Sequence, residues 1–126
     1  AQKKAEENKD VLDFVKETLG DKVFDVRLSR VLKSGSVCLT AEGPMSLEME
    51  KYFRKMGDDL GGMKAQRVLE LNADAPVYAA LAQAVAQDPE KAKKYARLLY
   101  DQACIIAGLP LEDTAAYTEL VCSLMQ

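Results

Sequence analysis

The sequence predicts a single α+β domain, in which a small three-stranded mixed sheet packs with helices. Apolar residues alternate with polar ones in three short segments and recur at helical spacing in five longer ones. No repeat, low-complexity tract or obvious linker divides the chain, so residues 1–126 are expected to form one domain. The expected order is helix, strand, strand, helix, strand, helix, helix, helix.

Residues 1–20 are expected to form the leading helix. Val11, Val15 and Leu19 recur every four residues, which places them on one face of a helix. Gly20 follows where a left-handed C-terminal cap is expected, so the helix should end there.

The next region, residues 21–72, is predicted to hold the sheet. Apolar residues alternate in 24–29, which is typical of a half-buried strand. Turn residues at 33–36 lead into a second strand at 37–40, and a short connection of this kind favours antiparallel pairing with the first strand.

A helix is expected inside this sheet region. Gly43 and Pro44 end the second strand, and an amphipathic helix follows over 45–56. A glycine-containing loop at 58–63 then leads to a third strand at 68–71. Because the connection contains a helix, the third strand could pair in parallel with the second.

The remaining region, residues 74–126, is predicted to be helical. Three aspartates are expected to cap its helices, because a carboxylate accepts hydrogen bonds from the free N–H groups of a first turn. They are Asp74, Asp88 and Asp113, before helices that begin at Pro76, run over 89–107 and run over 114–125.

The composition restricts the chemistry that the chain can perform. It has no His, which excludes a Ser-His-Asp triad, a Cys-His pair and a His-based metal site. A formal net charge of −3 argues against a dedicated nucleic-acid binder, because phosphate contacts need clustered Lys and Arg. The sequence shows no catalytic residues, and no cofactor-binding or metal-binding residues.

Cysteine usage and hydropathy indicate the compartment. Cys38, Cys104 and Cys122 are widely spaced and odd in number, which favours free thiols in a reducing environment. The N-terminus has no apolar signal-peptide core, and no apolar run reaches the length of a membrane span. We therefore expect a cytoplasmic chain without a membrane partner.

The amphipathic helix at 45–56 carries an unusual stripe of methionine and aromatic residues. Its members are Met45, Met49, Tyr52, Phe53 and Met56, all on one helical face. The spacing alone favours ordinary packing on the sheet. A methionine-rich stripe also suits an exposed surface that adapts to varied apolar partners.

The two C-terminal helices are apolar on more than one side. Self-association into a four-helix bundle would cover these faces, as would the leading helix and the sheet, and the pattern leaves both open.

Five segments of the chain, in register, resemble the C-terminal domain of the ninety-kilodalton heat-shock protein family, in its bacterial HtpG type. They are residues 26–32, 43–49, 69–76, 98–103 and 108–113. The chain departs from the family at Ala73, Ala75 and Thr114, and it ends without the acidic tail of the eukaryotic cytosolic members.

This resemblance implies a role in protein folding and the stress response. The family is an ATP-driven homodimeric chaperone whose ATP and magnesium site lies in an N-terminal domain, which is expected to be absent here, so this fragment would not be an enzyme. The matching helix would bind client proteins through Met45, Met49, Tyr52, Phe53 and Met56. The last two helices would dimerize in an intermolecular four-helix bundle through Tyr95, Leu98, Leu99, Gln102, Ala103, Ile106, Tyr117, Leu120, Val121 and Leu124.

Two alternatives remain from the residues themselves. A dimeric regulatory or nucleic-acid-binding module would use the basic patch of Lys91, Lys93, Lys94 and Arg97. A small enzyme would use the Cys38 thiol, although no His is present to activate it.

Overall fold

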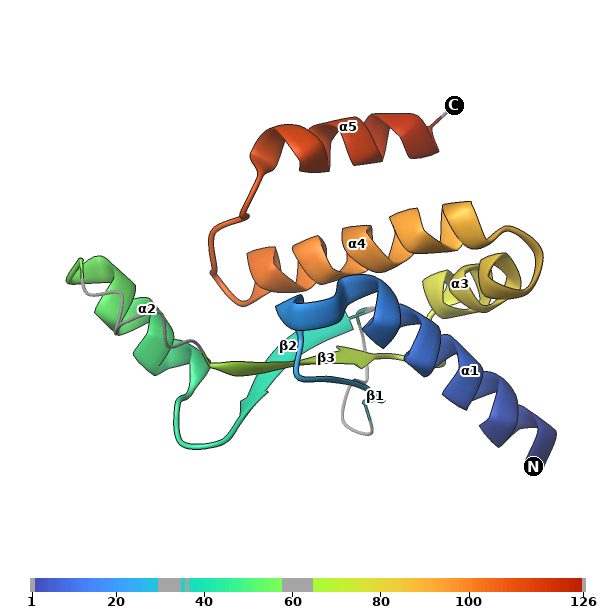
Figure 1. Cartoon of the computed structure of the whole chain (residues 1–126), viewed down its shortest axis with the longest axis horizontal. Helices are drawn as coiled ribbons and strands as arrows, with labels where there is room; N and C mark the ends of the chain where they lie inside the picture. Colours follow the sequence, from blue (N-terminus) through green and yellow to red (C-terminus); the bar gives the residue numbers. More distant parts are fainter. Residues whose placement is uncertain (1, 30–34, 36, 58–64, 126) are drawn as a thin grey trace.

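A computed structural model describes residues 2–29, 35, 37–57 and 65–125 of the chain. It shows the predicted α+β fold and the predicted order of elements (Figure 1). In chain order these are α1 (Gln2–Leu19), the 3-10 turn η1 (Gly20–Lys22), β1 (Asp25–Leu28), β2 (Val37–Glu42), α2 (Leu47–Lys55), β3 (Gln66–Leu71), α3 (Pro76–Gln87), α4 (Pro89–Ile106) and α5 (Thr114–Leu124).

The strand pairing differs from the prediction. The sheet order is β1-β3-β2, with β3 parallel to β1 and antiparallel to β2. The expected antiparallel pairing of β1 with β2, and the possible parallel pairing of β2 with β3, are therefore both wrong. The long connection through α2 lets β3 enter between the two earlier strands, where it gains partners on both sides.

One face of the sheet is apolar and packs into the hydrophobic core. In register, Val26 and Leu39 flank Leu69, while Leu28 and Val37 flank Leu71. Helices α1 and α4 lie over this face (Figure 1), and the core cluster includes Val11, Val15 and Leu19 of α1 together with Leu99 and Ala103 of α4. The predicted buried face of the leading helix is confirmed.

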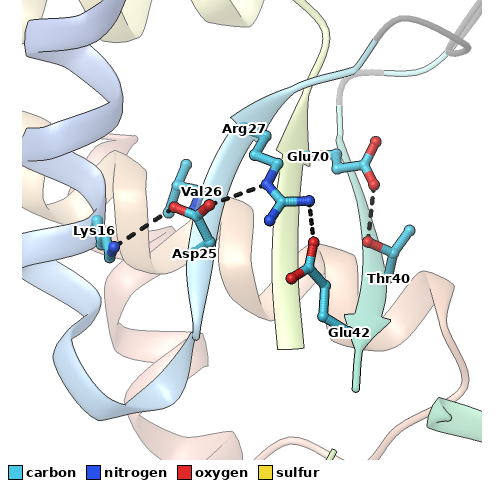
Figure 2. Close-up of polar contacts among 7 residues, drawn as sticks. All are labelled: Lys16, Asp25, Val26, Arg27, Thr40, Glu42 and Glu70. Atoms are coloured by element: carbon cyan, nitrogen blue, oxygen red, sulfur yellow. Dashed lines mark hydrogen bonds and ion pairs between the residues drawn. The ribbon is translucent and has the colours of Figure 1, made fainter. Parts of the chain in front are cut away.

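The other face of the sheet is polar and carries a chain of charged contacts (Figure 2). Arg27 Nε donates to Asp25 Oδ2 at 3.0 Å, and the Arg27 guanidinium also pairs with Glu42. Partial burial opposes ionisation of Asp25, but Arg27, the Val26 N–H and Lys16 outweigh it, so the pKa of Asp25 lies below its usual value. The face opposite the core is therefore largely polar, as strand alternation predicts, and Val68 at its centre is fully buried.

Helix ends follow the predicted capping, with one exception. Asp88 accepts from Lys91 N–H and Asp113 accepts from Ala116 N–H. Asp74 caps nothing, because Ala75 occupies the N-cap of α3 and makes no side-chain bond. The Asn72 side chain instead accepts from the Asp74 N–H at 3.0 Å, which forms a turn before the helix.

The outlying elements are α2 and α5. Figure 1 shows α2 extending from one end of the sheet and α5 lying beyond α4. Ser46 caps α2, a shorter helix than the predicted 45–56, by accepting from Met49 N–H. The predicted turn residues at 33, 34 and 36 and the predicted loop at 58–63 lie outside the described residues.

Candidate functional site

Helix α2 turns its apolar stripe outward. Tyr52 is 60% exposed and Met56 is 66% exposed, Met49 is also exposed, and Met45 and Phe53 are half-buried. The Phe53 ring meets that of Tyr52 edge to face, with ring centroids 5.7 Å apart. The stripe is therefore a surface, and the ordinary core packing that its spacing favoured is wrong for this helix.

The opposite face of α2 holds a buried carboxylate. Glu50 is only 3% exposed, and its Oε1 accepts from Arg67 Nη2 of β3 at 3.0 Å. Arg54 of α2 approaches the same oxygen at 3.6 Å. A helix that exposes its apolar residues and buries a charge must have a charged partner to bury it against.

Arg67 supplies that partner from inside the fold. It belongs to the core-facing set of β3 that includes Leu69 and Leu71, and it is 6% exposed. Its Nη1 donates to the Tyr100 hydroxyl oxygen of α4 at 2.8 Å and lies 3.9 Å from the sulfur of Cys104. Arg67 therefore contacts α2 on one side and α4 on the other.

Burial and hydrogen bonding set the charge states of this network. Burial lowers the pKa of Arg67, but Tyr100 and Glu50 raise it by more, so the net pKa lies above its ordinary value. Burial raises the pKa of Tyr100 to about 12, against the effect of Arg67. At neutral pH Arg67 is therefore a cation beside a neutral phenol. Among the described residues, Glu50 Oε2 and Arg67 Nε have no hydrogen-bond partner.

The half-buried Lys51 of α2 lies near the end of α4, because a Cβ atom built on Gly108 would be 3.4 Å from Lys51 Nζ. The ammonium group of Lys51 pairs with Glu48 of its own helix at 2.7 Å. The charged connection between α2 and α4 therefore runs from Glu50 through Arg67 to Tyr100.

The predicted dimer residues divide into two groups. Leu99 and Ala103 are buried in the core of the chain itself, so neither is available to a second copy in this conformation. This corrects the prediction for those two residues. The others remain accessible, with Ile106 exposed and the rest half-buried: Tyr95, Leu98, Gln102, Tyr117, Leu120, Val121 and Leu124.

Helix α5 leaves its apolar residues incompletely covered. Seven of its eleven residues are apolar, yet none is buried. It packs on α4, and the neighbouring Ile105 and Ile106 at the end of α4 are exposed. The C-terminal helix pair therefore leaves several apolar side chains without full cover from the described part of this chain.

The sequence reasoning missed the network of Glu50, Arg67 and Tyr100. A signal for it was present, because Arg67 stands directly before the apolar segment Val68-Leu69 and at an inward-facing position of the strand. An inward arginine needs an anion or aromatic hydroxyl nearby. The sequence did not show which of the chain's acids would supply that anion.

The structure gives little support to the two alternative sites, the Cys38 thiol and the basic patch on α4. Cys38 is half-buried, and burial together with Glu70 raises the pKa of its thiol, which makes it a poor nucleophile. The basic patch on α4 is exposed, with Lys93 paired to Glu90 and Lys91 lying over the Tyr95 ring.

Within the described ranges, no three His, Cys, Asp or Glu side chains gather as metal ligands would. None of the described helices is both long enough and apolar enough to span a bilayer.

Comparison with known proteins places this chain in a family. The family model described as Hsp90 protein matches residues 1–126. The chain belongs to the Hsp90 family. It is 44% identical over its whole length to the chaperone protein HtpG of Clostridium acetobutylicum, and 43% identical over 98% of its length to that of Bacillus subtilis. The HtpG of Shouchella clausii is 45% identical over 96% of the chain.

The match covers a limited part of each Hsp90-family relative. The chain spans about a fifth of the length of these curated relatives: 20% of the first two and 19% of the third. Family membership is therefore shown for this segment, and the activity of a whole Hsp90-type chaperone is a separate matter.

Proposed function

We propose that this chain is the C-terminal homodimerization and client-binding domain of an ATP-dependent, Hsp90-type chaperone of the bacterial cytoplasm. The observation that carries the proposal is that the chain has two separate apolar surfaces that its own fold does not fully cover. One is the α2 stripe of Met45, Met49, Tyr52, Phe53 and Met56, and the other is the C-terminal helix pair. Neither surface has the buried polar constellation of a catalytic site.

A second copy of the chain is the occupant that best suits the C-terminal pair. Tyr117, Leu120, Val121 and Leu124 form one face of α5 and are all half-buried. Completing their burial would contribute roughly 3–6 kcal/mol per copy, at about 1.5–3 kcal/mol for a whole side chain. A symmetric contact uses this face twice, so four helices would share one apolar core.

The dimerization test compares two adjacent positions on α5. Val121→Asp places a carboxylate on the half-buried apolar face, whereas Cys122→Asp places the same group on the exposed side. Sedimentation velocity over a concentration series should show a dimer for the original chain and for Cys122→Asp, and a monomer for Val121→Asp. A monomeric original chain, or a dimeric Val121→Asp variant, would overturn this part of the proposal.

Unfolded protein is the proposed occupant of the α2 stripe. Methionine and aromatic side chains adapt to varied apolar sequences without a fixed pocket shape. Met49→Ala combined with Phe53→Ala should weaken binding of a fluorescently labelled, reduced and alkylated test protein by at least fivefold. The control is Glu48→Ala with Lys55→Ala, which removes exposed charges from the same helix and should leave the affinity within twofold.

Two further measurements separate this proposal from other roles. Calorimetric titration with ATP and magnesium should show no binding to the isolated chain, because the proposed ATPase site belongs to another domain of the chaperone. Tight ATP binding would instead assign this segment to the nucleotide site. Duplex DNA binding that strengthens steeply at low salt would favour a nucleic-acid-binding module through the basic patch of α4.

A further inference from the structure

The polar face of α2 contacts the body of the domain through charges. Leu47 packs against the core cluster, and Glu50 is buried against Arg67 of β3. Apolar contacts allow a helix to slide at small cost, because the hydrophobic effect is non-directional. Charge-assisted hydrogen bonds require a narrow range of distance and angle, so Glu50 fixes where α2 lies.

Arg67 divides its guanidinium between two helices. One terminal nitrogen donates to Glu50 of α2 at 3.0 Å, and the other donates to Tyr100 of α4 at 2.8 Å. The guanidinium is planar and rigid, so a displacement of one partner changes the geometry offered to the other. The Glu50, Arg67 and Tyr100 side chains therefore form a direct physical connection between α2 and α4 that passes through no loop.

We propose that Glu50, Arg67 and Tyr100 act as positioning residues that couple the α2 surface to helix α4. In this arrangement a change at Tyr100 alters the stability of α2 and the affinity of the α2 stripe for client protein. Tyr100 acts through Arg67, because its hydroxyl bonds to Arg67 and not to α2. This inference rests on the proposed function for its biological meaning, since it makes client binding at α2 responsive to the packing of the dimerization helix. Such a connection is a coupling between two distinct sites.

The network is also incompletely satisfied. Within the described residues, Glu50 Oε2 and Arg67 Nε lack hydrogen-bond partners, and Arg54 offers a second guanidinium to Glu50 at 3.6 Å. Alternative pairings are therefore within reach of the same side chains.

The test removes a single oxygen atom from α4. Tyr100→Phe keeps the buried ring and deletes the hydroxyl, which accepts from Arg67 and also hydrogen-bonds to Cys104 of the same helix. Tyr78→Phe is the matched control, because it also deletes a largely buried hydroxyl, which donates to Asn8 at 2.8 Å on the α1 side of the fold. Amide hydrogen exchange followed by mass spectrometry reports the local opening of α2 separately from that of α1 and α3.

We expect Tyr100→Phe to speed exchange in α2 by about three- to tenfold relative to α1 and α3, and Tyr78→Phe to leave α2 unchanged. Glu50→Gln should speed exchange in α2 more strongly. The Glu50→Gln, Tyr100→Phe double variant should show less than the product of the two single effects, because both act through Arg67. Equal effects of the two tyrosine variants on α2, or fully multiplicative effects, would overturn the coupling.

Client affinity provides a readout that a purely structural role would not change. Binding of the reduced, alkylated test protein should weaken in Tyr100→Phe at least threefold while the dimer dissociation constant stays within twofold. The failure of the two proposals can be told apart. A chain that neither dimerizes nor binds the test protein refutes the proposed function, whereas the exchange measurements still decide the coupling.

Discussion

The ion pair between Glu50 and Arg67 allows a quantitative test of how α2 is held. Replacing Glu50 with Gln keeps the shape of the side chain and one acceptor oxygen but leaves the Arg67 cation buried without its counter-charge. Removing one partner of a buried pair typically costs about 3–5 kcal/mol. Because the neutral amide can still accept from Arg67 at the present 3.0 Å, we expect a loss of about 2–3 kcal/mol, at or below the lower end of that range.

The assay is urea unfolding followed by far-UV circular dichroism at one fixed protein concentration, since association shifts apparent stability. For a domain of this size, 2–3 kcal/mol corresponds to a fall in Tm of roughly 6–15 °C. Glu48→Gln is the control, because Glu48 lies on the same helix and pairs with Lys51 while 82% exposed. An exposed pair of this kind contributes little, so this variant should change stability by less than about 0.5 kcal/mol.

A double replacement tests the other half of the reasoning. Changing Glu50 to Leu and Arg67 to Met removes both charges and both unpartnered atoms at once, so stability should be close to that of the original chain or higher. The reasoning is refuted if Glu50→Gln is as harmless as Glu48→Gln, which would mean that the pair is solvated in solution. A double variant as unstable as the single one would show that the pair contributes net stability.

Two further predictions follow from burial. Leu99→Asp should unfold the domain, with loss of the helical circular dichroism signal, because Leu99 lies in the core. A variant that stays folded but becomes monomeric would contradict this and would indicate that Leu99 belongs to the dimer interface. Cys122 is exposed, whereas burial raises the pKa values of Cys38 and Cys104. Since a raised pKa leaves less thiolate at pH 8, iodoacetamide should modify Cys122 first, and mass spectrometry of the peptides would show any other order.

Local features of the fold could be predicted from the sequence because they depend on neighbouring residues. The periodicity of Val11, Val15 and Leu19 fixed the buried face of α1, and Asp88 and Asp113 cap helices as their positions indicated. The prediction for Asp74 was wrong because the N-cap of α3 is Ala75, one residue later, and the Asn72 side chain forms the turn that precedes it.

The sheet order could not be predicted because it depends on contacts distant in sequence. Alternation located the strands correctly, but it says nothing about which strand lies in the centre. The central position of β3 matches its composition in retrospect, since Arg67, Val68, Leu69 and Leu71 are all buried. A strand buried on both faces is typical of the middle of a sheet.

The spacing of the α2 stripe alone favoured packing on the sheet, whereas the family resemblance implied a surface open to client proteins. Both faces of α2 have residues that could turn inward, and the apolar face is the one that helical periodicity favours. The structure has the opposite orientation. Glu50 turns inward to pair with the buried cation of Arg67, and the stripe faces outward as a consequence. The contact between Glu50 and Arg67 therefore favours the orientation of α2 in which the stripe faces outward.

The two faces of α4 explain how dimerization and client binding could belong to one structural unit. Ala92, Ala96, Leu99 and Ala103 of its inner face are buried within this chain, so a second copy would use α5 and the residues of α4 that stay accessible. Tyr100, beside that inner face, contacts Arg67 directly. A shift of α4 caused by pairing would therefore reach Glu50 across two hydrogen bonds.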